Sequence, residues 1–263
     1  MEDCRTLSRH NDEAAIRAYY GALSRAWGPQ HWWPARARFE VIAGAYLTQN
    51  TAWTNVEKAL ENLRAARRLS VDGMRRAPLS EIERLIRPSG YFRQKAQRLK
   101  RFVAFLDAKY GGSLDRMFRQ PTAKLREELL ELNGVGPETA DSILLYAGNH
   151  PVFVVDAYTR RILDRHQILP EKTDYEEIRR LFEGALAKVE EKEQGKPEHN
   201  PVELELRGAA HPPSPMSTAR RTARVQVYNE MHGLIVGVGK NYCRKSQALC
   251  DECPLRKFLP GTG

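Results

Sequence analysis

The sequence predicts an all-α protein. Apolar residues recur at helical spacing over residues 13–182, and the pattern returns over residues 225–236. The only strand-like stretch is Val152-Phe153-Val154-Val155, and four residues do not make a sheet. These observations favour a fold of helices packed on helices.

The expected helices follow one another along most of the chain. Apolar residues within 14–23 suit a first amphipathic helix that ends before Gly28-Pro29. Apolar residues also share one helical face in three later segments: 39–47, 56–63 and 99–105. The spacing of a capping box marks two further starts: Ser80 with Glu83, and Thr173 with Glu176.

Composition and charge exclude some classes of protein and favour others. The 263 residues are 41% hydrophobic and 29% charged, as in globular proteins, and they include no apolar run of the roughly 18–20 residues that span a bilayer. The first residues mix both charges without an apolar core, so we expect no secretory signal and a cytoplasmic location, at the nucleoid in a prokaryote. A net charge of +9 favours a polyanionic partner such as nucleic acid.

Residues 188–223 interrupt the helical pattern. The segment begins with Glu and Lys, and continues through Pro212-Pro213-Ser214-Pro215 to several arginines. This composition buries little apolar area to offset the entropy of ordering, so we expect a mobile insertion here.

The most informative stretch is a turn between two expected helices. Leu125, Leu129 and Leu132 belong to the first helix, which stops at Gly134-Val135-Gly136, and Pro137 opens the second, where a missing N–H costs nothing. The turn amides and the free amides of the second helix can bind a phosphate oxygen. Such a contact positions a DNA backbone without reading its sequence.

Asp156 follows the apolar segment and opens another expected helix. Its ordinary role would be that of an N-cap. A carboxylate at the edge of a buried segment can also oppose positive charge that develops on a ligand.

These motifs together resemble the helix-hairpin-helix DNA glycosylase superfamily, which includes endonuclease III. The Gly-Val-Gly hairpin and the Val-Val-Asp segment carry the resemblance, and Leu47-Thr48-Gln49-Asn50-Thr51, the segment 88–96 and a carboxyl-terminal cysteine triplet extend it over residues 32–183 and 225–255. It implies two helical lobes: a six-helix barrel with the hairpin in residues 34–150, and a lobe of both termini, residues 1–33 and 151–263. We expect a monomer that acts on double-stranded DNA, with Asp156 as catalytic carboxylate.

Glu138 decides which chemistry the resemblance implies. Endonuclease III-type enzymes carry at this place a lysine whose amine attacks the sugar C1′ and forms a Schiff base. A carboxylate cannot form an imine, and the nearest upstream lysine is Lys124. We therefore expect hydrolysis alone, in which Asp156 stabilises an oxocarbenium-like transition state and Glu138 completes the site.

All four tryptophans lie between Trp27 and Trp53. His31-Trp32-Trp33-Pro34 and the Gln-Asn-Thr-Ala-Trp segment resemble the 3-methyladenine DNA glycosylase III branch, which implies a base pocket of Trp33, Pro34 and Trp53. Trp27 and Trp32 are expected to be packing residues. Because an alkylated purine is cationic, aromatic walls favour it as the substrate.

The turn at Gln49 and Asn50 has two readings. The superfamily places there a residue that fills the gap left by the flipped nucleotide, and either amide could bond to the orphaned base. Asn50 could equally be a helix C-cap.

Three cysteines crowd the carboxyl end. Cys243, Cys250 and Cys253 resemble three ligands of the 4Fe-4S cluster of endonuclease III, whose fourth cysteine would fall at Leu259. Cys4 is a candidate for the fourth thiolate; a cluster with one non-protein ligand and a degenerate site are the alternatives. A cluster would brace a basic DNA-binding loop that contains Lys240, Arg244 and Lys245.

The sequence thus predicts a monofunctional DNA glycosylase of base excision repair that acts on an alkylated purine. One alternative is an endonuclease III-like glycosylase with AP lyase activity on oxidised pyrimidines. The other is a non-catalytic helix-hairpin-helix protein that only binds DNA.

Overall fold

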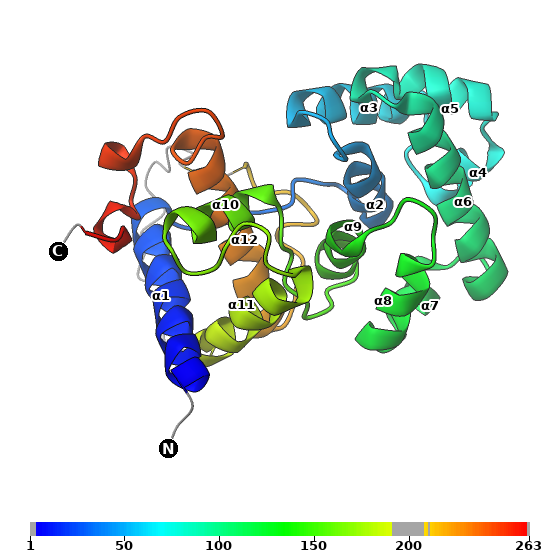
Figure 1. The fold of residues 1–263 in the computed structure, drawn as a ribbon. Helices are drawn as coiled ribbons and strands as arrows, with labels where there is room; N and C mark the ends of the chain where they lie inside the picture. Colours follow the sequence, from blue (N-terminus) through cyan, green and yellow to red (C-terminus); the bar gives the residue numbers. More distant parts are fainter. Residues whose placement is uncertain (1–3, 191–207, 210, 262–263) are drawn as a thin grey trace. The chain divides into compact units, whose positions relative to one another are not determined.

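A computed structural model describes residues 4–190, 208–209 and 211–261 and confirms the all-α class. Within these residues the only β-type pairing is an isolated bridge between Cys243 and Ala248. The α-helices are α1 Cys4–Trp27, α2 Arg38–Leu47, α3 Trp53–Ala65, α4 Val71–Arg76, α5 Leu79–Leu85, α6 Phe92–Tyr110, α7 Leu114–Phe118, α8 Thr122–Leu130, α9 Pro137–Ser142, α10 Ala157–Arg165, α11 Tyr175–Glu190 and α12 Ala223–Asn241 (Figure 1). Short helices of other types are η1 Arg87–Ser89, η2 Ile143–Ala147, η3 Cys250–Glu252 and η4 Arg256–Phe258.

None of the helices in the described part of the chain combines the length and apolar character that crossing a membrane requires.

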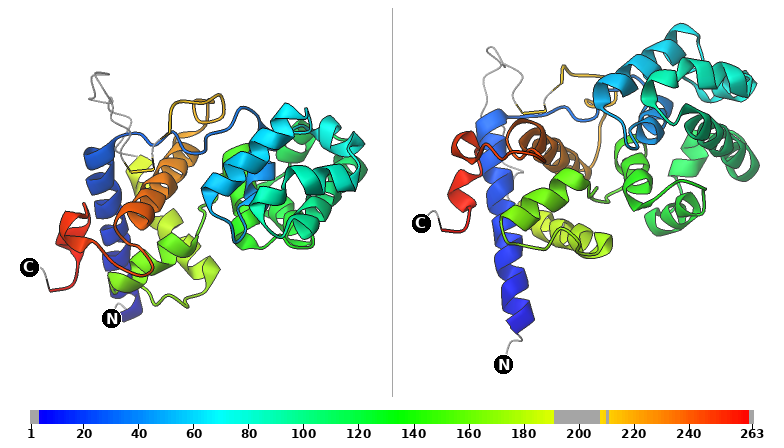
Figure 2. Two further views of the ribbon diagram at one scale, coloured as in Figure 1. Left: turned by 90° about the horizontal axis from the view of Figure 1, so that it is seen from above. Right: turned by 45° about the horizontal axis from the view of Figure 1, so that its top comes forward.

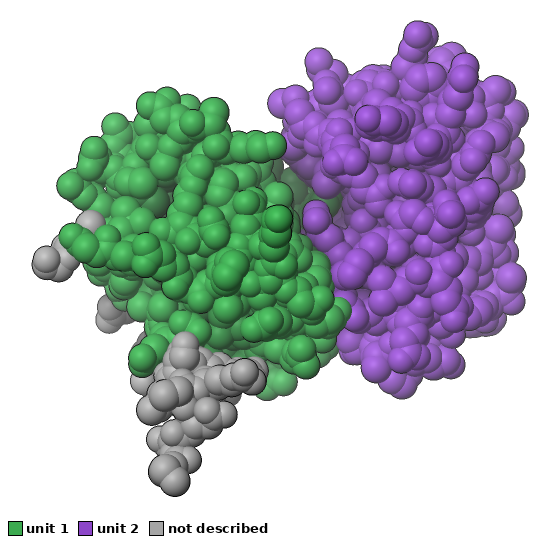
Figure 3. Space-filling model, in the orientation of Figure 1, with its two compact units in different colours: residues 1–34, 151–263 green, residues 35–150 purple. Residues whose placement is uncertain are grey.

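The chain divides into two compact units (Figure 3). Unit 1 contains residues 1–34 and 151–263, and unit 2 contains residues 35–150. The division lies one residue away from the boundary expected from the sequence.

Unit 2 is built around α2. Every residue from Phe39 to Leu47 is buried, so this helix is covered on all sides rather than on the single face expected. It contacts α3, α6, α9 and η2. Serine N-caps start the short helices α4 and α7, where Ser70 and Ser113 accept hydrogen bonds from the backbone N–H groups of Gly73 and Arg116.

Unit 1 packs α1, α10, α11 and α12 together. Figures 1 and 2 show α1 beside α11 and α12, and α10 contacts α12. Aromatic stacking ties the extended segment before α10 to α11, because the rings of Phe153 and Phe182 lie 4.3 Å apart at an interplanar angle of 8°. The core of unit 1 thus holds the segment that leads to Asp156.

The expectation of a mobile insertion at residues 188–223 stays a prediction, although the structure describes contacts for part of this segment. Helix α11 continues to residue 190, and residues 191–207 and 210 lie outside the described residues. The backbone N–H of Ala209 donates to Gln30 Oε1 over 2.9 Å, and that of His211 donates to the Gln30 carbonyl. Ala209 and Met216 are buried. Gln30 supplies hydrogen-bond acceptors to the backbone N–H groups of Ala209 and His211, which have no helical partners.

Both predicted capping boxes are wrong. Helix α5 starts after Pro78, and Ser80 lies inside its first turn. At α11 the cap is Asp174, whose carboxylate accepts from the backbone N–H groups of Glu176 and Glu177. Aspartate competes well with threonine for this position.

Candidate active site and DNA-binding surface

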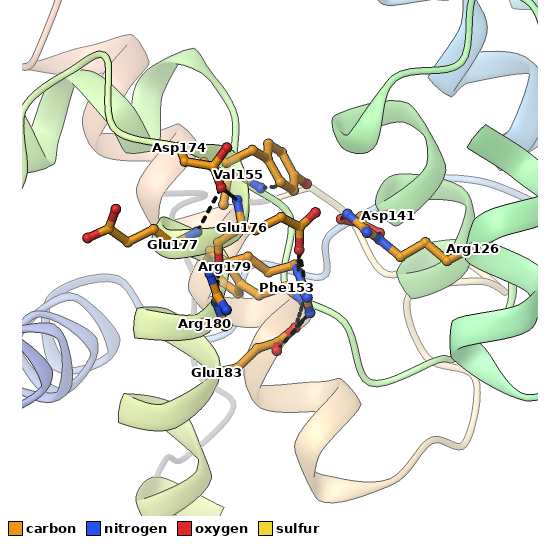
Figure 4. A network of polar contacts seen from close by, with 11 residues as sticks. Arg126, Asp141, Phe153, Val155, Asp174, Glu176, Glu177, Arg179, Arg180 and Glu183 are labelled. Atoms are coloured by element: carbon orange, nitrogen blue, oxygen red, sulfur yellow. Dashed lines mark hydrogen bonds and ion pairs between the residues drawn. The ribbon is translucent and has the colours of Figure 1, made fainter. Parts of the chain in front are cut away.

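Hydrogen bonds from α11 hold the extended segment that precedes Asp156. Phe153 N–H donates to Glu183 Oε1 over 3.0 Å, and Val155 N–H donates to the Tyr175 hydroxyl over 3.3 Å (Figure 4). Arg179 in turn donates to both oxygens of Glu183, at 2.7 and 2.9 Å. Two of the backbone amides of this strand-like segment are thereby satisfied without a sheet.

Asp156 is the N-cap of α10, as expected. Its Oδ1 accepts the backbone N–H of Thr159 at 2.8 Å, and its own backbone N–H donates to Thr159 Oγ1 at 3.5 Å, which forms a capping box. Oδ1 also accepts the Thr159 hydroxyl at 2.9 Å. Its Oδ2 lies 3.6 Å from His232 Nε2 on α12. Burial raises the pKa of the Asp156 carboxyl, but His232 and the Thr159 donors outweigh burial, so this pKa lies below its ordinary value.

An aromatic cluster adjoins the Asp156–His232 pair in unit 1. The ring of Trp32 lies 5.9 Å from Trp33, 6.1 Å from His232 and 5.5 Å from His211. Trp32 and Trp33 are both buried, and Lys240 Nζ lies 5.7 Å from the Trp32 ring. Trp32 therefore lies against the imidazole beside the carboxylate, and Trp33 lies against Trp32. Pro34 is half-buried at the end of the same segment.

The predicted hairpin is present in unit 2, between α8 and α9, with Pro137 as the first residue of α9. Gly134 has a φ of +81°, and a Cβ there would lie 2.0 Å from Arg98 Nε. Gly134 is thus required both by its backbone angle and by the arginine that covers it. Gly136 has an ordinary φ of −95° and open space around its Cα, and Val135 is buried.

Gln49 and Asn50 have different surroundings on the turn after α2. The Gln49 amide nitrogen donates to the Gly134 carbonyl and to Thr139 Oγ1, each over 2.9 Å, and its oxygen accepts from Arg98 over 2.7 Å. Gln49 therefore fastens the turn to the hairpin. Asn50 is exposed with a φ of +51°, a conformation that asparagine tolerates. Of the two amides, that of Asn50 is the accessible one.

Lys95 braces the same turn from α6. The side chain is 1% exposed, and its Nζ donates to the carbonyls of Leu47 and Ser89 and to Thr51 Oγ1, at distances from 2.7 to 2.9 Å. Burial, and then the charge of Arg98, lower the pKa of Lys95 to about 8. Three acceptors around one buried ammonium hold the turn of residues 48–51 against the turn that precedes α6.

Replacement of Lys95 tests this brace. Lys95→Met removes three hydrogen bonds, two of them to buried carbonyls, and is expected to cost about 3 kcal/mol of unfolding free energy, which lowers Tm by about 10 °C at this chain length. Lys58→Met, at an exposed position of α3, is the control and should keep the wild-type Tm. Thermal unfolding followed by circular dichroism measures both. Equal Tm values for the two variants would contradict the brace.

The lowered pKa of Lys95 predicts that the stability of the wild-type protein depends on pH. The Lys95 pKa of about 8 lies below the value of 10.5 in the unfolded chain, so the folded state binds fewer protons between these values. Burial of the charged lysine therefore lowers the unfolding free energy by its full amount below about pH 8. The unfolding free energy rises again as pH increases toward 10.5, where the lysine is neutral in both states.

Two further predicted residues lie on unit 2. Trp53 begins α3, is half-buried, and donates from Nε1 to Glu57 over 2.9 Å. Glu138 lies exposed in the first turn of α9, where negative charge suits a helix N-terminus.

Comparison with known proteins identifies the family of this fold. The model of the HhH-GPD superfamily of base excision DNA repair proteins matches residues 43–188, more than half of the chain. The chain belongs to this superfamily.

Individual relatives agree with the assignment to the HhH-GPD superfamily. A protein of Methanocaldococcus jannaschii named as a DNA repair glycosylase is 39% identical over 252 residues, which cover 95% of this chain and 98% of the relative. Endonuclease III of Thermotoga maritima is 28% identical over 218 residues, which cover 83% and 80%. The crystal structure of H. pylori 3-methyladenine DNA glycosylase, bound to 1,N6-ethenoadenine, superposes with a TM-score of 0.68 at 28% identity and covers 87% of this chain and 97% of that one.

The cysteine triplet of this HhH-GPD protein surrounds a cavity of about 20 Å³ in unit 1. Cys243, Cys250 and Cys253 line it, together with Leu259 at the position of the superfamily's fourth cysteine. Burial raises the pKa of the Cys253 thiol, and the other two cysteines raise it further. Arg165 donates to Cys243 Sγ over 3.3 Å.

The four-thiolate set for a 4Fe-4S cluster is not met by the described residues. The side chain of Cys4 lies outside those that the structure describes, so Cys4 as the fourth thiolate stays a prediction. Nor do the described residues include three or more candidate ligands in metal-binding geometry. A cluster held by three thiolates remains a prediction, which the visible absorption spectrum of fresh protein tests.

The predicted basic loop is held in place by α10. Arg165 donates to the carbonyls of Arg244 and Lys245, and Arg161 donates to the Cys243 carbonyl over 2.7 Å. The side chains of Lys240, Arg244 and Lys245 are exposed, as a phosphate contact requires.

Several residues that the structure brings to these sites were not predicted from the sequence. His232 reaches Asp156 from another helix, and Arg98 links Gly134 with Gln49. Tyr91 is 67% exposed, with a φ of +45°, directly before α6. An exposed tyrosine beside the braced turn is an available stacking surface, and only its unusual exposure reveals it.

Proposed function

We propose that this member of the HhH-GPD superfamily is a monofunctional DNA glycosylase that hydrolyses the N-glycosidic bond of an alkylated purine. The observation that carries the proposal is the buried Asp156 carboxylate with His232 beside it, in a chain whose hairpin has Glu138 in place of the lysine. Asp156 offers charge where the sugar becomes cationic, and the hairpin offers no amine to form an imine.

The substrate class rests on the aromatic residues. A purine alkylated at N3 or N7 carries positive charge and has a weakened glycosidic bond. The base is therefore a good leaving group and needs little activation by the protein. An aromatic face stabilises such a cation by about 0.5–2 kcal/mol. Trp33 and Pro34 are the proposed aromatic and apolar contacts of the base. The same role for Trp53 stays a prediction from the sequence. The solved relative that binds 1,N6-ethenoadenine supports a modified adenine as the substrate.

The proposed DNA contacts divide into two groups. The amides of Gly134 and Gly136 bind phosphate, as do Lys240, Arg244 and Lys245. The phosphate contact expected for the Val135 amide is not supported, because this buried N–H donates to the Leu132 carbonyl over 3.0 Å. Asn50 and Tyr91 are the proposed contacts to bases that lose their partners when the damaged nucleotide leaves the double helix, because they are the accessible side chains of the braced turns.

Release of free bases from a defined duplex tests the substrate class. A mixture of duplexes that carry 3-methyladenine, 1,N6-ethenoadenine, uracil or thymine glycol is incubated with the protein, and released bases are identified by mass spectrometry. Alkylated adenines are expected to appear first and fastest. Preferential release of thymine glycol would support the endonuclease III-like alternative, and binding without release would support a non-catalytic role.

A further inference from the structure

We propose that His232 is the positioning partner of Asp156, and that its imidazolium, with Nε2 3.6 Å from Oδ2, is the counter-charge that lets Asp156 enter the reaction as a carboxylate. The inference rests on the proposed function, because it concerns the ionisation of the proposed catalytic group.

The two oxygens of Asp156 face different partners. Oδ1 is taken by the N–H and the hydroxyl of Thr159, two neutral donors on the same helix. Oδ2 lies 3.6 Å from Nε2 of His232, and the exposed fractions of the two side chains are 12% and 6%. The Thr159 contacts cap the N-terminus of α10. The contact with His232 places beside Oδ2 a group that can carry a positive charge.

Burial makes this partner necessary. A carboxylate that is largely withdrawn from water tends to take up a proton unless a cation or hydrogen-bond donors hold it charged. A protonated Asp156 could not oppose positive charge on the sugar. An imidazolium at Oδ2 keeps the oxygen ionised, and an approaching cationic sugar can take over part of that role as the glycosidic bond breaks.

The close packing of α12 on α10 sets the distance between His232 and Asp156. Gly239 lies two turns beyond His232 on α12, and a Cβ there would come within 2.1 Å of the Tyr158 ring on α10. This glycine lets α10 and α12 approach closely. Phe153 and Trp32 confine the imidazole, with ring centroids 6.3 and 6.1 Å away.

Other charged or titratable groups surround the pair but are engaged elsewhere. Arg161 lies over the Tyr158 ring at 5.1 Å, and Glu183 is bound by Arg179. The remaining groups on the neighbouring segments are Glu230, which accepts from Gln30 N–H, Lys240, which lies over Trp32, and His211, which packs against Trp32. Each of these groups contacts another residue. Among the described residues, His232 is the ionisable side chain that lies within ion-pair distance of Asp156 Oδ2.

The pH profile of base release tests the proposal. His232→Gln keeps a donor at this place but removes the charge, so the acid limb of the single-turnover rate should move to higher pH by about one unit. At a pH on that limb the rate then falls about tenfold, while the rate on the alkaline side and the Kd for DNA change little. His166→Gln, which alters a histidine bound to Tyr19, is the control and should leave the acid limb where it is. Superimposable profiles for wild type and His232→Gln would overturn the proposal.

A second measurement does not depend on activity. The ¹³C resonance of the Asp156 carboxyl in the wild-type protein is expected to titrate below the ordinary value for aspartate, and above the wild-type midpoint in His232→Gln. A wild-type midpoint at or above the ordinary value would overturn the pairing. If the titration is as expected but no base is released, the proposed function fails while the pair stands.

Discussion

Asp156→Asn is expected to lower the rate of base release about 10²–10³-fold without lowering Tm or DNA affinity. An amide cannot offset charge on the sugar. Its oxygen can still accept the N–H and the hydroxyl of Thr159, and asparagine is as good an N-cap as aspartate. Single-turnover release of 3-methyladenine from duplex DNA, with protein in excess, measures the rate.

Asp164→Asn is the matched control for this variant. Asp164 lies on the same helix, is exposed, and accepts a hydrogen bond from the Glu171 N–H that an amide can also accept. It loses the same charge as Asp156→Asn but should release base at the wild-type rate. Wild-type activity in Asp156→Asn would show that this carboxylate is not the catalytic one.

Gly134→Ala is expected to weaken DNA binding at least tenfold and to lower Tm by about 5 °C. Alanine at a φ of +81° costs about 1–2 kcal/mol, and its Cβ would displace the Arg98 guanidinium. Arg98 also holds the Gln49 amide, so the hairpin and the turn of residues 48–51 lose a shared contact. Fluorescence anisotropy with a labelled duplex measures the affinity.

The second glycine of the hairpin provides the comparison. Gly136 has a φ of −95°, and an added Cβ would meet nothing within 4 Å. Gly136→Ala should therefore keep Tm at or slightly above that of the wild type, because alanine restricts the unfolded chain. A loss of stability as large as that of Gly134→Ala would contradict the assigned roles of the two glycines.

The features that the sequence predicts well are those carried by short local patterns. The end of α1 before Gly28, the hairpin with Pro137 at the start of α9, and Asp156 as an N-cap all depend on residues a few positions apart. Glycine, proline and capping residues act on the backbone next to them, so their positions can be read from the sequence alone.

The features that were missed depend on contacts between distant segments. His232 approaches Asp156 only because α12 packs on α10, and Gln30 orders residues 209 and 211 from a remote loop. Gln49 illustrates the same limit within unit 2. Its place on a turn suggested a contact with DNA, but three partners in the hairpin and α6 engage its amide.

Borohydride trapping during base removal tests most directly whether water or an amine displaces the base. The wild-type protein is incubated with a duplex that contains one 3-methyladenine, in the presence of sodium borohydride, and the products are separated by denaturing electrophoresis. Hydrolysis predicts free 3-methyladenine and an intact abasic strand with no protein attached. A protein–DNA adduct that accumulates in step with base release would contradict it, since only an imine with a protein amine can be reduced to such a product.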